Sequence, residues 1–131
     1  MTYLLDTNIC SDIVNDKPHH VLERFQLEDP GNIGLSSVSA AELAYGVAKS
    51  GSTKNQRALE MFMSALTILP FDEQAIWEYG RIRCELERIG QPIGGLDTMI
   101  AAHAISLKAT LVTNNTKEFA RIRGLRLENW S

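Results

Sequence analysis

The chain has 131 residues, of which 44% are hydrophobic and 22% charged, and its formal net charge is −3. These values are typical of one globular domain with one core, and they exclude a disordered or collagen-like chain. The longest apolar stretches are only of strand length and Asp6 interrupts the first, so we expect no membrane span, no secretory signal and a cytoplasmic protein.

Charge is distributed unevenly along the chain. Residues 1–78 carry 5 Lys/Arg and 11 Asp/Glu, whereas residues 79–131 carry 8 and 5, giving −6 and +3 and so the total of −3. The acidic half suits a metal centre, and the basic residues of the second half either contact phosphates or form an ordinary solvated surface. These basic residues are Arg81, Arg83, Arg88, Lys108, Lys117, Arg121, Arg123 and Arg126.

Apolar runs and turn signals in the first half predict two strands, each followed by helices. In chain order we expect a strand at 3–5, helices at 9–15 and 21–27, a strand at 33–38 and a helix at 39–49. Ser39 and Glu42 have the spacing of a capping box, which would start the last of these helices. Cys10 and Cys84 both fall in predicted helices, so we expect reduced core thiols and no disulfide.

The second half continues the alternation of helices and strands. The expected elements are a helix at 56–66, a strand at 67–69, helices at 73–89 and 97–107, a strand at 110–112, a short helix at 117–121 and a strand at 126–128. Short, continuously apolar strands that alternate with helices favour a parallel sheet covered on both faces. Ligands bind beyond the carboxyl ends of such strands, where Asp6, Glu42 and Thr113 fall.

Three carboxylates therefore share one predicted edge: Asp6, Glu42 and Asp97. Each also has a structural interpretation, because Asp6 and Asp97 can cap the helices that they precede or begin and Glu42 can complete the capping box. Like charges ~4 Å apart repel by about 4 kcal/mol at an effective dielectric constant near 20. Three carboxylates on one edge consequently predict a bound cation.

The donor set indicates which cation. Carboxylates without Cys or His at zinc spacing favour Mg²⁺, with Mn²⁺ as a substitute. Such an ion activates water and stabilises charge on phosphate, so the pattern predicts phosphodiester hydrolysis with Asp6 and Asp97 as ligands and Glu42 as a ligand or water-orienting group. For His103 we expect a partly buried structural role. Glu118 is either a fourth carboxylate of the site or an exposed helix residue, and the supporting polar residues are Thr7, Asn8, Thr113, Asn114 and Asn115.

Motifs spread over the whole chain resemble those of PIN-domain ribonucleases, specifically the VapC toxins of type II toxin–antitoxin systems. They are Leu5-Asp6-Thr7-Asn8, Ala41-Glu42-Leu43 with Gly46, GGLDTMIAAH at 94–103, LVTNN at 111–115 with Phe119, and the closing segment 124–130. The resemblance implies a single PIN domain over residues 1–131. It also implies an α/β/α sandwich whose parallel sheet has about five strands in the order 3-2-1-4-5.

The same resemblance implies a Mg²⁺- or Mn²⁺-dependent endoribonuclease that forms a homodimer and is inhibited by a VapB antitoxin. The family's acidic site corresponds to Asp6, Glu42 and Asp97. Many members have another acid where this chain has Asn115, and Glu118 is the nearest replacement. The implied substrate is structured RNA, notably the anticodon loop of tRNA, while other members cut ribosomal RNA. The implied inhibition places an antitoxin Arg at the acidic site.

Two other classes of doubly wound protein fit this sequence less well. An aspartate-based phosphatase requires a second Asp where this chain has Asn8, and a receiver domain requires an acidic pair and a late Lys that are not evident. A binding protein without turnover would not need all three carboxylates. The helical residues Leu59, Phe62, Met63 and Ile76 form either core or a dimer interface.

Overall fold

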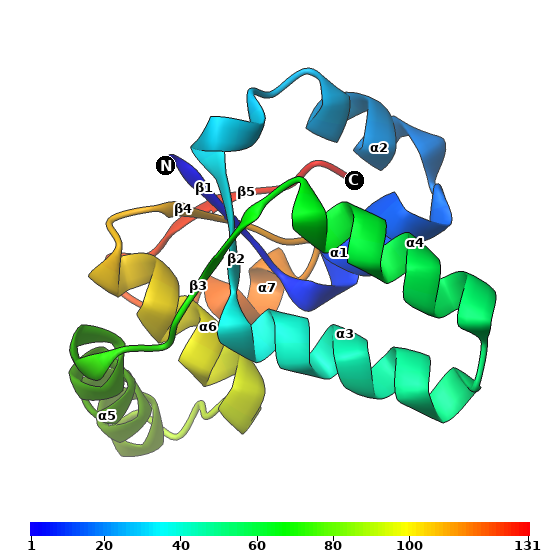
Figure 1. Cartoon of the computed structure of the whole chain (residues 1–131). Helices are drawn as coiled ribbons and strands as arrows, with labels where there is room; N and C mark the ends of the chain where they lie inside the picture. The colour runs from blue at the N-terminus through cyan, green and yellow to red at the C-terminus, as the bar shows by residue number, and fades with distance from the viewer.

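A single five-stranded sheet forms the centre of the computed structural model, which describes all residues from Met1 to Ser131 (Figure 1). Every strand pair is parallel, and the strand order β3-β2-β1-β4-β5 confirms the predicted one. The strands are β1 (Tyr3–Leu5), β2 (Ile33–Ser36), β3 (Thr67–Leu69), β4 (Thr110–Val112) and β5 (Arg126–Glu128).

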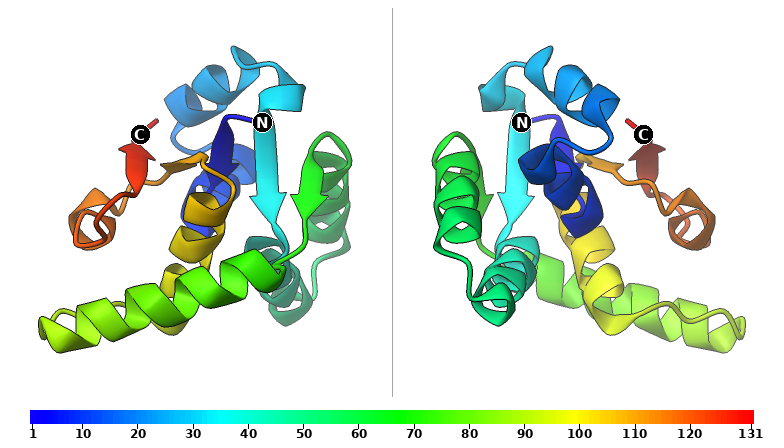
Figure 2. Two further views of the ribbon diagram at one scale, coloured as in Figure 1. Left: turned by 90° about the vertical axis from the view of Figure 1, so that its left-hand side faces the viewer. Right: turned by 90° about the vertical axis from the view of Figure 1, so that its right-hand side faces the viewer.

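Helices cover both faces of this sheet, which makes the expected three-layer α/β/α sandwich (Figure 2). They are α1 (Thr7–Asn15), α2 (His19–Gln26), the 3-10 helix η1 (Pro30–Asn32), α3 (Ser37–Ser50), α4 (Thr53–Ser64), α5 (Glu73–Arg88), α6 (Gly95–Ser106) and α7 (Thr116–Phe119). None of them is both long and apolar enough to cross a lipid bilayer.

Two apolar cores lie on opposite faces of the sheet because consecutive strand residues point in opposite directions. Leu4 and Leu111 pack with α5, α6 and α7, while Leu5 and Val112 pack with α1, α2 and α4. Helix α3 begins at the end of β2 and contributes to both cores, through Val38 on one side and Leu43 on the other. This position carries α3 along the carboxyl edge of the sheet, where the candidate site lies.

Several expected boundaries and environments differ from the structure. The strand expected at 33–38 ends at Ser36, whose hydroxyl accepts a hydrogen bond from the Val38 N–H and so caps α3. The capping box with Ser39 is therefore wrong. Both cysteines are free as predicted, but only Cys10 is buried, and Cys84 is exposed on α5.

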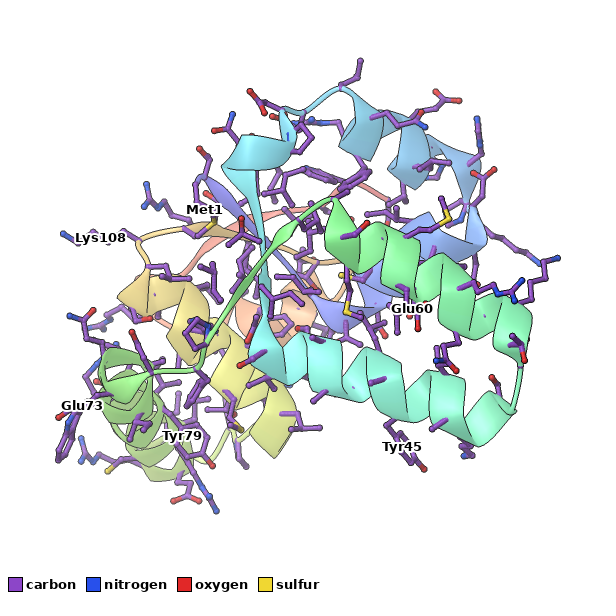
Figure 3. All side chains as sticks on the ribbon, viewed as in Figure 1. Met1, Tyr45, Glu60, Glu73, Tyr79 and Lys108 are labelled. Carbon is purple, nitrogen blue, oxygen red and sulfur yellow. The ribbon has the colours of Figure 1, made fainter.

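The apolar helical residues also divide differently from the expectation. Leu59 and Phe62 belong to the core, whereas Ile76 is exposed next to Trp77, of which 73% is exposed. Helix α5 buries Ala75, Ile82 and Leu86, so the two residues directly after Ala75 point away from the sheet. Tyr45 likewise projects from α3 into solvent (Figure 3).

The carboxyl terminus is held against the sheet by Trp130. Its ring lies edge-on to Tyr3, with 5.4 Å between ring centroids, and its indole N–H donates to Glu128 Oε1 at 2.9 Å. The guanidinium carbon of Arg24 lies 4.7 Å above the indole, and Arg24 also pairs with Glu128 at 3.2 Å. These contacts join α2 to the start of β1 and to the end of β5.

Replacing this indole should destabilise the whole domain. We expect Trp130→Ala to lower the free energy of unfolding by about 3 kcal/mol, because it removes a buried ring together with its hydrogen bond. Trp130→Phe, the matched control, keeps the ring contact and should cost about half as much. Urea denaturation measures both values, and an Ala variant within ~1 kcal/mol of the wild type would contradict this interpretation.

Candidate active site

Asp6 lies at the junction of β1 and α1 and is only 3% exposed. One carboxylate oxygen accepts the Asn8 N–H at 2.7 Å, which caps α1, and the other accepts the hydroxyl of Thr113. Burial raises the pKa of the Asp6 carboxyl above its ordinary value, although both hydrogen bonds act in the opposite direction. The capping interpretation of Asp6 is thus correct, but a cap does not require such burial.

Glu42 lies inside α3, five residues beyond its first residue, and cannot cap that helix. Its Oε1 instead accepts the hydroxyl of Thr7 at 3.1 Å. Since Thr7 directly follows Asp6, this bond holds the Glu42 carboxylate next to the start of α1. Sequence reasoning identified Thr7 as a supporting residue but did not find its partner.

Asp97 is the third residue of α6, and the cap of that helix is Gly94, which makes no side-chain capping bond. The expected capping role of Asp97 is therefore wrong. Its pKa is raised to about 6, mainly by burial and then by the charges of Asp6, Glu42 and Glu118. A helix amino terminus stabilises an anion, so the effects of burial and of these neighbouring charges outweigh a favourable position.

Asn115 and Glu118, the two residues considered for the fourth position of the site, are hydrogen-bonded to each other. The Asn115 side-chain amide donates to Glu118 Oε2 at 3.0 Å, and the Asn115 backbone N–H donates to the Thr113 hydroxyl oxygen at 3.0 Å. A continuous series of hydrogen bonds therefore runs from Asp6 through Thr113 to Glu118. Asn114 is exposed, and Asn8 contributes its backbone N–H while its side chain is exposed.

The residues of the site fit a hard divalent cation. No three His, Cys, Asp or Glu side chains converge closely enough to ligate one ion together. Mg²⁺ does not require this, because it usually keeps several water ligands and binds one or two carboxylates directly. The nearby donors are oxygens, so Asp6 and Asp97 can hold the ion while Glu42 and Glu118 act through water.

His103 is not among these donors. It is 1% exposed, its Nδ1 lies 2.8 Å from Ser36 Oγ, and its ring packs edge-on against Phe71. Burial lowers its pKa, which favours the neutral ring. The expected structural role is confirmed, and the bond to Ser36 ties α6, which carries Asp97, to the start of α3, which carries Glu42. Nothing in the sequence pattern indicated that link.

A groove of about 480 Å³ leads away from Thr7 and Glu42 between α1, α3 and α4. Val14, Leu43, Val47 and Leu59 form apolar parts of its lining. Its remaining polar lining consists of Ser11, Asn15, Lys54 and Asn55. We call the edge of the sheet that carries Asp6, Glu42, Asp97 and Glu118 the acidic edge. At Glu42 this edge opens onto a concave surface that is large enough to accept a peptide segment or nucleotides.

Comparison with known proteins identifies the family. Residues 3–125 match the PIN domain, and the chain is 48% identical to ribonuclease VapC2 of Rickettsia felis over 99% of this chain and 98% of that protein. The chain belongs to the VapC ribonucleases of the PIN-domain family. It is therefore an endoribonuclease, and PIN-domain nucleases generally depend on a divalent metal ion.

Other VapC proteins are similar over their whole length. The tRNA(fMet)-specific endonuclease VapC of Shigella flexneri is 46% identical, with 100% of this chain and 99% of that protein covered. Among solved structures, VapBC2 from Rickettsia felis bound to a promoter DNA fragment matches with a TM-score of 0.92 and 45% identity over all of both chains. The VapC fold thus extends through every element described above.

Removing the Asp97 charge should stabilise the metal-free protein. Its folded-state pKa of about 6 exceeds the ordinary 3.8, so ionisation costs stability as pH rises from about 4 through 6. At pH 7.5 we expect Asp97→Asn to be more stable by about 1 kcal/mol after allowance for solvent screening, and equal to wild type near pH 4.

Thermal melting in EDTA at both pH values measures this difference. Adding Mn²⁺ should raise the wild-type midpoint and leave the Asp97→Asn midpoint almost unchanged, because a ligand that binds only the folded state stabilises it. A variant that is less stable than wild type at pH 7.5 without metal would show that the carboxylates do not repel one another.

Proposed function

We propose that this chain is the toxin of a VapBC pair, a single-domain endoribonuclease that uses Mg²⁺, or Mn²⁺ in its place, at Asp6, Glu42, Asp97 and Glu118. The observation that carries the proposal is the set of carboxylates held at one edge of the sheet, Asp6 by Thr113, Glu42 by Thr7 and Glu118 by Asn115. Burial and the charges of these three raise the pKa of Asp97 to about 6. Such a cluster stores repulsion that a bound cation relieves. Metal binding and the charge of the site are therefore linked.

Each residue then has a defined task. Asp6 and Asp97 hold the cation, which when bound would lower the pKa of a coordinated water and stabilise charge on the scissile phosphate. Thr113 and the Asn8 N–H orient the Asp6 carboxylate. Glu42, oriented by Thr7, is placed to align the attacking water, and Asn115 orients Glu118.

We propose tRNA, cut in its anticodon loop, as the substrate, which would stop translation in the cytoplasm. The support comes from two relatives, the tRNA(fMet)-specific endonucleases VapC of Shigella flexneri and Salmonella typhimurium, which are 46% and 44% identical to this chain. A loop offers splayed, unpaired nucleotides, which an open edge with a concave groove accommodates better than a duplex does.

The proposed partner is a VapB antitoxin, because structures of VapBC complexes cover the whole of this chain. The groove beside Thr7 and Glu42 offers apolar surface for a peptide segment, and the acidic edge offers ion pairs to an antitoxin Arg. A homodimer is part of the same proposal. The exposed Ile76 and Trp77 on α5 are apolar residues available for such an interface.

Cleavage of total cellular RNA by purified, antitoxin-free protein tests the nuclease proposal. We expect Mg²⁺-dependent cleavage that EDTA abolishes, and at least a hundredfold loss in Asp6→Asn and Asp97→Asn, because each removes a charge that would bind the metal. Asp29→Asn, which changes an exposed carboxylate that caps η1 at the amino end of β2, is the matched control and should retain activity. Equal cleavage by wild type and both Asn variants would exclude this site.

Sequencing the cut ends identifies the substrate. We expect the ends to map to anticodon loops of a small set of tRNAs, and ends confined to ribosomal RNA would refute the tRNA assignment. Adding the antitoxin should abolish both cleavage and the Mn²⁺-induced rise in melting temperature, because it would occupy the acidic edge. A complex that still cleaves RNA and still melts at a higher temperature with Mn²⁺ would refute direct inhibition at this site.

A further inference from the structure

A separate hollow of about 340 Å³ lies between the carboxyl-terminal half of α5 and the chain around α7. Figure 2 shows these two segments facing each other in both views. Ile82, Leu86 and Ile122 are buried beneath the hollow, and Glu85 is the one carboxylate that lines it. Three cationic side chains surround this apolar floor, namely Arg88, Arg121 and Arg123.

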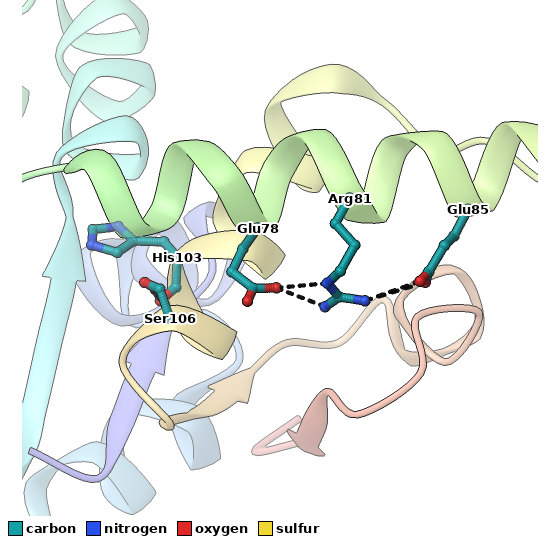
Figure 4. A network of polar contacts seen from close by, with 5 residues as sticks. All are labelled: Glu78, Arg81, Glu85, His103 and Ser106. Atoms are coloured by element: carbon teal, nitrogen blue, oxygen red, sulfur yellow. Dashed lines mark hydrogen bonds and ion pairs between the residues drawn. The ribbon is translucent and has the colours of Figure 1, made fainter.

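The arginines elsewhere on α5 are paired with carboxylates. Arg81 lies between Glu78, at 2.7 Å, and Glu85, at 3.2 Å (Figure 4), and Arg83 pairs with Glu87 at 3.4 Å. The Glu85 carboxylate is thus already paired with Arg81, which does not line the hollow. Helix α5 consequently has two arginines that are paired with carboxylates and a third, Arg88, that lines the hollow without a carboxylate partner.

The arginines of the hollow have no carboxylate within ion-pair distance. Arg88 makes only a 3.5 Å contact with the Cys84 sulfur, and Arg121 donates to the Pro92 carbonyl at 3.3 Å. Arg123 is exposed and makes no hydrogen bond. Three arginines without a carboxylate partner therefore line one concavity, in a protein whose net charge is −3.

A smaller hollow of about 160 Å³ lies next to this region, between α5 and the start of α6. It shares Leu86 with the larger hollow, which we call the arginine hollow after Arg88, Arg121 and Arg123. It reaches Gly95 and Thr98, which flank Asp97 in the first turn of α6. Pro92, which lines it, is the residue whose carbonyl accepts from Arg121. Helix α5, which carries Arg88, therefore packs beside the first turn of α6, which carries Asp97.

We propose that the arginine hollow binds backbone phosphates of the RNA strand, away from the bond that is cut; this rests on the proposed nuclease function. An acidic edge repels a polyanion, so a substrate needs cationic contacts at a distance from the carboxylates. Guanidinium groups fit phosphate oxygens in a bidentate manner. Since α5 packs on α6, which carries Asp97, the hollow lies one helix away from the acidic edge, and a single RNA strand can contact both; RNA, and not an acidic protein, is therefore the proposed occupant.

The test compares the double variant Arg88→Gln/Arg123→Gln with Arg57→Gln. Arg57 is an exposed, unpaired arginine on α4, outside the hollow, and each of these changes removes the charge while keeping a polar side chain. Arg121 is left intact because its hydrogen bond to Pro92 supports the loop. The probe is a fluorescently labelled tRNA in EDTA, titrated over a salt series.

We expect the double variant to bind about tenfold more weakly at ~0.1 M salt. Its slope of log K against log salt should be less steep by about 1.5, since each lost phosphate contact removes roughly 0.7–0.9. In Mg²⁺ the KM should rise while kcat is kept, because contacts away from the cut bond act equally on ground and transition states. Arg57→Gln should match the wild type in every measurement.

A salt slope and a KM equal to those of Arg57→Gln would overturn the proposal. So would an unchanged slope with an altered mass in sedimentation, because the hollow would then be a protein interface. The nuclease function fails separately, if wild type binds the tRNA but no Mg²⁺-dependent cleavage occurs. The salt slopes are measured in EDTA, so they still decide whether the hollow holds phosphate.

Discussion

The parallel pairing of β1 with β4 is the constraint on which the site depends. It brings the ends of these strands together, so that the Asp6 N–H donates to the Val112 carbonyl and the Thr113 hydroxyl donates to the Asp6 carboxylate. An unpaired buried carboxylate would cost several kcal/mol. Thr113 then accepts from Asn115, which in turn holds Glu118. One pairing thus orients two carboxylates that are distant in sequence.

In the proposed function, the acidic edge binds the cation and the arginine hollow binds the RNA, so groups of opposite charge do the two tasks. Repulsion among Asp6, Glu42 and Asp97 reduces stability in the absence of metal, which is the usual relation between a charged site and the fold that carries it. The same repulsion would disfavour an approaching phosphate. In the proposed function, positive charge placed away from the carboxylates, at Arg88 and Arg123, would attract the substrate without neutralising the residues that would bind the cation.

Sequence reasoning succeeded where a signal is local. Asp6 follows an apolar run of strand length, and alternating strands and helices require a parallel sheet, so the edge that carries the site followed directly. It failed at the start of α3, because Ser36 and Ser39 are both acceptable caps. Only the neighbouring strands decide where β2 stops, since the residues after Ser36 have no pairing partner in the sheet.

The sequence by itself determined the fold class, because alternating strands and helices are a local pattern, and its family resemblance implied the strand order that the structure has. The oxygen-donor site is a prediction from residue types. Tertiary structure decided which groups meet: Thr7 with Glu42 across 35 positions, and Ser36 with His103 across 67. It also separated paired from unpaired arginines on α5. Such contacts depend on how helices pack over the sheet, and packing distances are not encoded in the spacing of residues along the chain.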